Sequence, residues 1–156
     1  MSSSKPLRTQ HLSLPNAILL GEVKRYIQQG KSATIRTKGN SMLPFIRGSV
    51  DSVQLSARAQ YRKGDIVLAE IAPDHYVLHR IWSITEDKVV LMGDGNCSGK
   101  EECRPENLVA KVDYIITPSE RKINPDRCIQ RFFAKCWRIL LPLRGYLLAI
   151  YFRLFK

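Results

Sequence analysis

The sequence predicts a mainly β fold, in which one helix precedes a compact, coiled β domain and a helical tail follows it. Between residues 33 and 116, short segments rich in Val, Ile, Thr and Tyr alternate with turn residues such as Gly, Pro and Asp. Before and after this stretch, apolar residues recur at helical spacing instead. At 156 residues the chain is long enough for about one domain with a proper core.

A helix is expected over residues 13–29. Ser13 can cap its first turn, and Pro15 suits that turn because an N–H there would have no helical partner. Gly30 follows and can end the helix. One face collects four apolar residues: Ala17, Leu20, Val23 and Ile27. Residues 1–12 are polar and are expected to form a flexible N-terminus.

Six strands are expected in a β body over residues 32–117, which completes a domain over residues 13–117. They are Ala33–Thr37, Ser52–Leu55, Ile66–Ile71, Tyr76–Thr85, Lys88–Met92 and Leu108–Ile116. The turn residues Glu86-Asp87 should join the fourth and fifth of these strands into a hairpin.

Residues 118–156 are expected to form a basic amphipathic helical tail. Pro142 should divide it into two helices or kink a single one. The whole chain has a formal net charge of +11, and residues 121–156 carry nine basic residues against Asp126 alone. Because this segment is also rich in Leu, Ile, Phe and Trp, a membrane surface is a better partner for it than nucleic acid.

Five residues of the tail are expected near lipid headgroups: Trp137, Arg138, Arg144, Tyr146 and Tyr151. The alternative is that the apolar face of the tail packs on the β domain or on another copy of the protein. The chain shows neither a secretory signal nor the roughly 18–20 apolar residues that span a bilayer. The expected location is therefore cytoplasmic or peripheral to a membrane, with the cytoplasmic face as the default.

No metal site and no cofactor are expected. The four cysteines form no Cys-x-x-Cys pair and have few histidines nearby. A disulfide between Cys97 and Cys103 is one possibility, and free thiols in a reducing compartment are the other.

Ser41 is the candidate nucleophile. It stands in Gly39-Asn40-Ser41-Met42-Leu43-Pro44, after a short strand, where Gly39 permits a tight turn. Such a turn can expose the serine Oγ and aim backbone N–H groups at a developing oxyanion, which makes Asn40 and Met42 candidate substrate or oxyanion contacts. The alternative is an ordinary turn serine that bonds a backbone group.

His79 is the candidate base. It lies in residues 76–82, a segment otherwise typical of a buried strand. An imidazole titrates near neutral pH and can therefore accept the serine proton. The alternative is a structural histidine that bonds a backbone carbonyl. Arg80 should point to the opposite face of the strand, away from Ser41.

Asp94 is the candidate acidic partner that would orient His79 and stabilise its charged form. It lies between two glycines in Met92-Gly93-Asp94-Gly95-Asn96. Asn96 could hold this loop or the backbone of a substrate. The alternative is an ordinary turn, because Asp-Gly is among the commonest turn pairs.

These motifs resemble the clan of serine peptidases that joins type I signal peptidases with the self-cleaving SOS-repressor peptidases. The likeness covers residues 34–112, about half of the chain. Residues 39–44, 79–81 and 92–96 resemble the nucleophile, general-base and Gly-Asp boxes of the clan. Residues 63–67 resemble its conserved strand entry, and residues 106–112 resemble its closing strand. His79 stands where the bacterial enzymes have lysine, as in the endoplasmic-reticulum and archaeal branch.

The resemblance implies a coiled, mostly antiparallel β fold and a serine endopeptidase with a Ser41–His79 dyad. The implied substrate is a peptide or precursor protein, such as a leader or signal-like peptide, bound in extended form along a strand and cut after a small residue. That branch usually has a second aspartate after the Gly-Asp box, where this chain offers Glu101 and Glu102. The identity of the acidic partner is therefore open. No N-terminal membrane anchor and no Ala-Gly or Cys-Gly self-cleavage dipeptide is present.

Two other functions are alternatives. The same fold could bind peptides in its groove without cleaving them. A basic nucleic-acid-binding protein could contact phosphates through residues 121–156, although phosphate binding does not require the apolar content of this segment.

Overall fold

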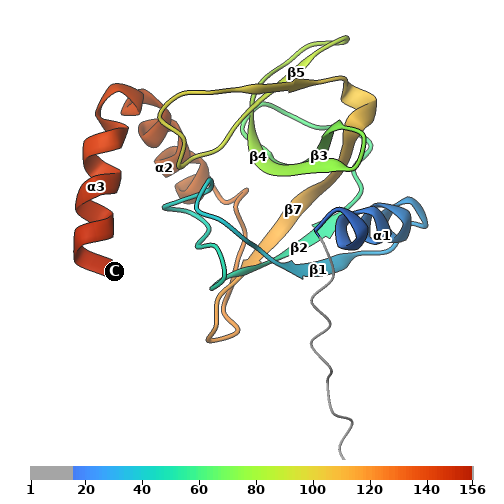
Figure 1. The fold of residues 1–156 in the computed structure, drawn as a ribbon, viewed down its shortest axis with the longest axis horizontal. Helices are drawn as coiled ribbons and strands as arrows, with labels where there is room; N and C mark the ends of the chain where they lie inside the picture. Colours follow the sequence, from blue (N-terminus) through green and yellow to red (C-terminus); the bar gives the residue numbers. More distant parts are fainter. Residues whose placement is uncertain (1–15, 156) are drawn as a thin grey trace, which may run out of the picture.

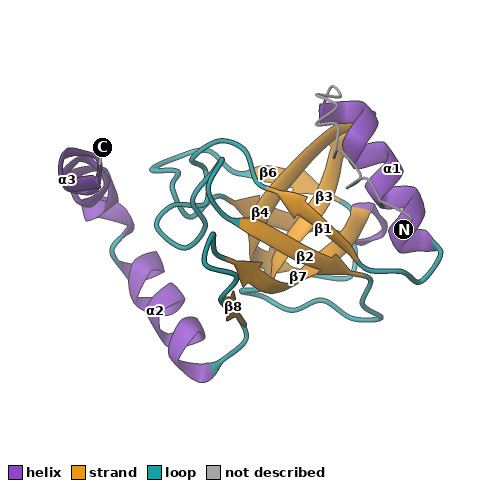
Figure 2. Cartoon of the chain, turned by 90° about the horizontal axis from the view of Figure 1, so that it is seen from below, coloured by secondary structure: helices purple, strands orange, loops and turns teal. Residues whose placement is uncertain are grey.

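The structure, a computed structural model, describes residues 16–155, so the expected flexible segment 1–12 lies outside it. It shows a mainly antiparallel, curved β sheet with α1 (Asn16–Gln28) before it and α2 (Cys128–Ile139) and α3 (Arg144–Phe155) after it (Figure 1). The predicted fold class is confirmed. Figure 2 shows α1 at one side of the sheet and the two C-terminal helices at the other.

The sheet contains eight strands within the described residues, in the order β1-β2-β7-β3-β4-β5-β6, with β8 paired to β7. Their bounds are β1 Ala33–Arg36, β2 Ser52–Ser56, β3 Ile66–Ala72, β4 His75–Ile84, β5 Val89–Met92, β6 Glu101–Cys103, β7 Leu108–Ile116 and β8 Lys122–Ile123. All pairings are antiparallel, and β4 and β5 form the expected hairpin. Short 3-10 turns precede β7 at Pro105–Asn107 and precede α3 at Leu141–Leu143.

The six expected strands are present with shifts of one residue at some ends, whereas β6 and β8 were not expected. Both are short, and β6 reads Glu-Glu-Cys, which lacks the Val, Ile, Thr and Tyr that identify the other strands. The strand β6 exists because it adds to the free edge of β5, where Glu101 pairs with Leu91.

The core lies where α1 packs against the curved sheet. Val23 and Ile27 of α1 are buried, as the helical spacing predicts, and they meet Val53 and Leu55 from the alternating strand β2. The loop between β1 and β2 adds Met42 to the same cluster. A second cluster joins β3, β4 and β5 around Val67, Ile81, Val89 and Leu91. The site described below therefore lies on a loop that is part of the core.

A charge cluster attaches the tail to the sheet. Asp65, almost completely buried, accepts bonds from Lys111 of β7 at 3.1 Å and from Arg131 of α2 at 2.6 Å. The same two cations contact Asp126, at 2.7 and 2.8 Å. Partial burial would by itself raise the pKa of Asp126, but its bonds to Lys111 and Arg131 outweigh this effect and lower the pKa. A buried aspartate thus fixes the position of α2.

The ion pair between Lys24 of α1 and Glu70 of β3 should make a pH-dependent contribution to the stability of the fold. The hydrogen bond from Lys24 lowers the pKa of Glu70, although burial opposes the shift. A carboxyl group with a lower pKa in the folded state stabilises the fold above its unfolded pKa, about 4.3, and loses this effect as the pH falls through the folded value.

We therefore expect Glu70→Gln to cost at most about 1 kcal/mol at pH 7. The difference from wild type should disappear as urea unfolding is repeated from pH 7 down to about pH 3. Glu22→Gln, on the exposed side of α1, is the control and should leave the unfolding midpoint unchanged. If Glu70→Gln changed the free energy of unfolding by the same amount over this pH range, the proposed role of the Lys24–Glu70 ion pair would be contradicted.

Candidate active site

Ser41 lies on the loop between β1 and β2, and the apolar neighbours of Ser41 anchor this loop. Met42, Leu43 and Ile46 are buried, while Ser41 itself is half-buried. The N–H groups of Phe45 and Ile46 donate to the Met42 carbonyl at 3.1 and 3.0 Å. Gly39 has a φ of +73°, the conformation that the predicted tight turn requires. The loop is therefore a rigid turn that leaves the serine accessible.

His79 lies on β4, opposite Val67 of β3, and is 5% exposed. Its Nδ1 lies 2.9 Å from Oε2 of Glu101 on β6. A carboxylate at this distance favours the tautomer in which Nδ1 carries the proton, so that Nε2 is free to act as a base. Glu101 is therefore the acidic partner of His79. The neighbouring Glu102 is exposed and pairs with Lys88 at 2.7 Å.

The prediction that Asp94 orients His79 is wrong. Both oxygens of Asp94 accept bonds from Arg80, at 2.9 Å from Nε and 2.7 Å from the terminal nitrogen Nη2. Arg80 pairs in register with Met92, two residues before Asp94, and alternation along β4 separates Arg80 from His79. The aspartate and the glutamate thus serve neighbouring residues of one strand.

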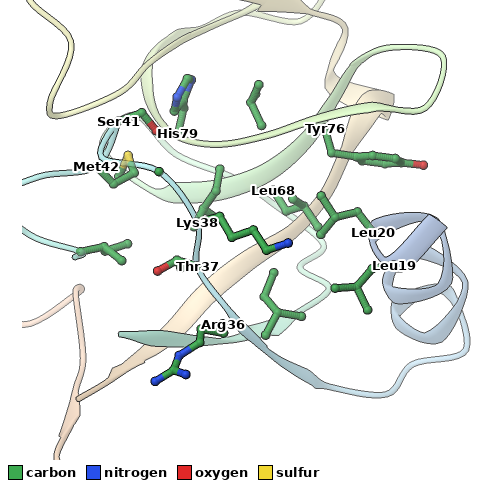
Figure 3. A pocket seen from close by; sticks show the side chains of 15 residues that line it. Leu19, Leu20, Arg36, Thr37, Lys38, Ser41, Met42, Leu68, Tyr76 and His79 are labelled. Carbon is green, nitrogen blue, oxygen red and sulfur yellow. The ribbon is translucent and has the colours of Figure 1, made fainter. Parts of the chain in front are cut away.

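Ser41 and His79 line one pocket of about 210 Å³, at the same end of it in Figure 3. The remaining walls come from α1, β1, β3, β4 and the loop after β1, and they combine apolar side chains with Arg36, Thr37 and Lys38. The apolar side chains include Leu19, Leu20, Ile35, Leu68, Tyr76 and Leu78. Of the three expected substrate or oxyanion residues, Met42 lines this pocket, whereas Asn40 and Asn96 do not.

Residues 93–96, here called the Gly-Asp loop, pack directly on the backbone of the serine turn. The N–H of Gly95 donates to the Ser41 carbonyl at 2.7 Å. A Cβ on Gly93 would overlap the Ser41 carbonyl oxygen, and a Cβ on Gly95 would overlap that of Asn40. Only glycine allows this approach. Asn96 donates its N–H to Gly93 at 3.1 Å and so holds the loop, one of its two expected roles.

The C-terminal helices hold the Gly-Asp loop from its other side. The Trp137 indole N–H donates to the Asp94 carbonyl at 2.7 Å. Arg144 is 2% exposed and donates to the Asn96 carbonyl at 2.7 Å and the Trp137 carbonyl at 3.2 Å. Burial lowers the pKa of Arg144, against the opposing charge of Asp94.

These contacts show that some of the five tail residues expected near lipid headgroups contact the domain instead. The prediction is wrong for Arg144, which is buried, and Trp137 is also turned toward the Gly-Asp loop. Arg138 donates to the Trp82 carbonyl at 3.0 Å and stacks on the Trp82 ring. Each of the three side chains donates to at least one backbone carbonyl of the domain, which a helical pattern cannot reveal. Tyr146 is 75% exposed, and Tyr151 is half-buried against Phe155.

The constellation of Ser41, His79 and Glu101 can support nucleophilic attack with a general base. Within residues 16–155, no group of three or more His, Cys, Asp or Glu side chains is placed to hold a metal ion. Neither a family model nor a curated protein matches this chain. The functional proposal therefore rests on this geometry and on the motifs themselves.

The close approach of the Gly-Asp loop can be tested with Gly95→Ala. The added methyl group has to displace the Asn40 carbonyl, so we expect a loss of about 1–3 kcal/mol in the free energy of unfolding. Gly145→Ala is the control, because a Cβ at Gly145 meets only the Cys97 Sγ at an ordinary 3.6 Å. The measurement is denaturant unfolding, and equal midpoints for Gly95→Ala and wild type would rule out the packing described here.

Proposed function

We propose that the protein is a serine endopeptidase of signal peptidase type. The observation that carries this proposal is the position of His79, with Glu101 on its Nδ1 at 2.9 Å and Ser41 in the same pocket. The serine, histidine and Gly-Asp motifs resemble those of the signal peptidase and SOS-repressor clan. The histidine points to the Ser-His branch of that clan.

In the proposed mechanism, Ser41 Oγ attacks the peptide carbonyl while His79 Nε2 accepts its proton. Glu101 holds the imidazole in the required tautomer and stabilises the imidazolium that forms. The imidazolium then gives the proton to the leaving amine. In the second half of the reaction, water attacks the acyl-enzyme, His79 accepts the proton of the water, and the proton passes to the departing Ser41 oxygen. Backbone N–H groups of the serine turn are the candidate donors to the oxyanion.

The proposed substrate is an extended leader or signal-like peptide of a precursor protein, cut after a small residue. The strand β1 supports extended binding, because it ends the strand order of the sheet and Ile35 and Arg36 of β1 line the pocket. A peptide could add alongside this edge through main-chain bonds and place its side chains in the apolar pocket.

A peptide-binding domain without catalysis is the second candidate, because the pocket and the β1 edge would serve it equally well. Nucleic-acid binding has less support, since the Ser41–His79–Glu101 arrangement has no part in contacting phosphates. No helix within the described residues is long and apolar enough to cross a bilayer. We propose that the enzyme acts as a peripheral membrane protein, with the cytoplasmic face as the default side.

The experiment that tests catalysis is labelling by a serine-directed covalent probe, such as a peptide phosphonate. The increase in protein mass, measured by mass spectrometry, reports the labelling. Ser41→Ala should abolish labelling, and His79→Ala should slow it by about 10²–10⁴-fold, because the base is lost. Ser49→Ala, in the same loop and exposed, is the matched control. Circular dichroism must show that each variant is folded, and His79→Gln serves as a second variant if His79→Ala unfolds.

Labelling of wild type should be lost in acid, because an imidazole accepts a proton only when neutral. A folded protein that remains unlabelled between about pH 6 and 9 would favour the peptide-binding alternative.

A further inference from the structure

The helix α2 is oriented with its apolar side toward solvent. Ile129, Phe132, Phe133 and Ile139 are between 54% and 78% exposed, although they lie on one arc of the helix. A surface helix of a globular protein normally turns such an arc toward the core.

The polar side of α2 faces the domain instead, and specific bonds hold it there. Arg131 reaches the buried carboxylate of Asp65 at 2.6 Å. About two turns further along the helix, Arg138 donates to the Trp82 carbonyl at 3.0 Å, and its guanidinium lies 3.6 Å from the centre of the Trp82 ring. Rotating α2 to bury its apolar side would break these contacts, so the exposure of the apolar side is a consequence of the bonds that Arg131 and Arg138 make.

The helix α3 also exposes apolar side chains. Its Arg144 and Leu148 are buried, whereas Ile150 and Leu154 are 54% and 71% exposed. The outer face is defined here as six residues: Ile129, Phe132, Phe133, Ile139, Ile150 and Leu154. A large exposed apolar surface of this kind marks a site of interaction. Figures 1 and 2 both show α2 and α3 together on one side of the sheet, away from α1.

The charges around the outer face identify its partner. Lys135 is exposed on α2, three residues after Phe132 and four before Ile139, and Arg153 is exposed beside Leu154 on α3. No acidic residue lies between Arg127 and Phe155. Two copies of this face would bring like charges together, whereas an anionic headgroup layer would neutralise them while the apolar side chains enter the acyl boundary.

We propose that the outer face of α2 and α3 docks on the surface of an anionic lipid bilayer. The Phe and Ile side chains insert below the headgroups, and Lys135 and Arg153 extend to the phosphates. The residues in contact with lipid are therefore those that point away from the domain, while Trp137 and Arg144 hold the Gly-Asp loop on the opposite side.

The test is co-sedimentation of the full chain with vesicles of phosphatidylcholine containing about 30% phosphatidylglycerol, compared with phosphatidylcholine alone. The double variant Phe132→Glu/Phe133→Glu should bind at least about tenfold more weakly than wild type, because it places two carboxylates in the outer face. Ile18→Glu is the matched control, since Ile18 on α1 is 54% exposed, as is Phe133. Circular dichroism checks that both variants are folded.

Wild type should prefer the anionic vesicles and should keep part of its binding at about 0.5 M salt, where charge alone is screened. Absence of binding, or equal binding by the double variant, would overturn the proposal. A wild-type dimer without lipid that the double variant converts to a monomer would assign the face to a second copy. Binding to single-stranded DNA that the double variant retains, without vesicle binding, would also overturn it.

Discussion

The contact between the Gly-Asp loop and the serine turn is the constraint on which the site depends. Two carbonyl oxygens of the turn lie so close to Gly93 and Gly95 that neither glycine can carry a side chain. Buried Met42 fixes the serine turn on the core side, and the Gly-Asp loop packs against its other side. The Gly-Asp loop itself accepts hydrogen bonds from Trp137 and Arg144. The position of Ser41 therefore depends on residues from Gly93 to Arg144, far later in the chain.

Side chains alternate between the two faces of β4, and this alternation separates two pairs of polar residues. His79 faces Glu101 and the pocket, whereas Arg80 faces Asp94 and the Gly-Asp loop. One partnership orients a candidate base, and the other ties the loop that supports the nucleophile. Partly buried charges are costly unless each has a partner, and both pairs here are closed by bonds of 2.9 Å or less to a carboxylate. A carboxylate also draws Arg131 of α2 inward, toward Asp65, while Phe132 and Phe133 stay exposed.

Elements encoded by local sequence patterns could be predicted, whereas contacts between residues far apart in the chain could not. Val, Ile and Thr alternation located six strands, and helical spacing located α1 and the tail helices. The motifs named Ser41 and His79 as candidates, and the structure places both in one pocket. Glu101 could not be chosen over Asp94, because its partnership with His79 arises from the unexpected pairing of β6 with β5. Likewise, the amphipathic pattern of α2 identifies an apolar side, but only the bonds to Asp65 and Trp82 decide which way that side points.

A double-mutant cycle on the rate of covalent labelling can decide whether Glu101 acts through His79 on Ser41. Glu101→Gln should slow labelling at least about tenfold in wild type and should have no further effect in His79→Ala, because its action requires the imidazole. Glu102→Gln, the exposed neighbour, should change neither rate. The account would be contradicted if Glu101→Gln slowed labelling equally with and without His79, or no more than Glu102→Gln does.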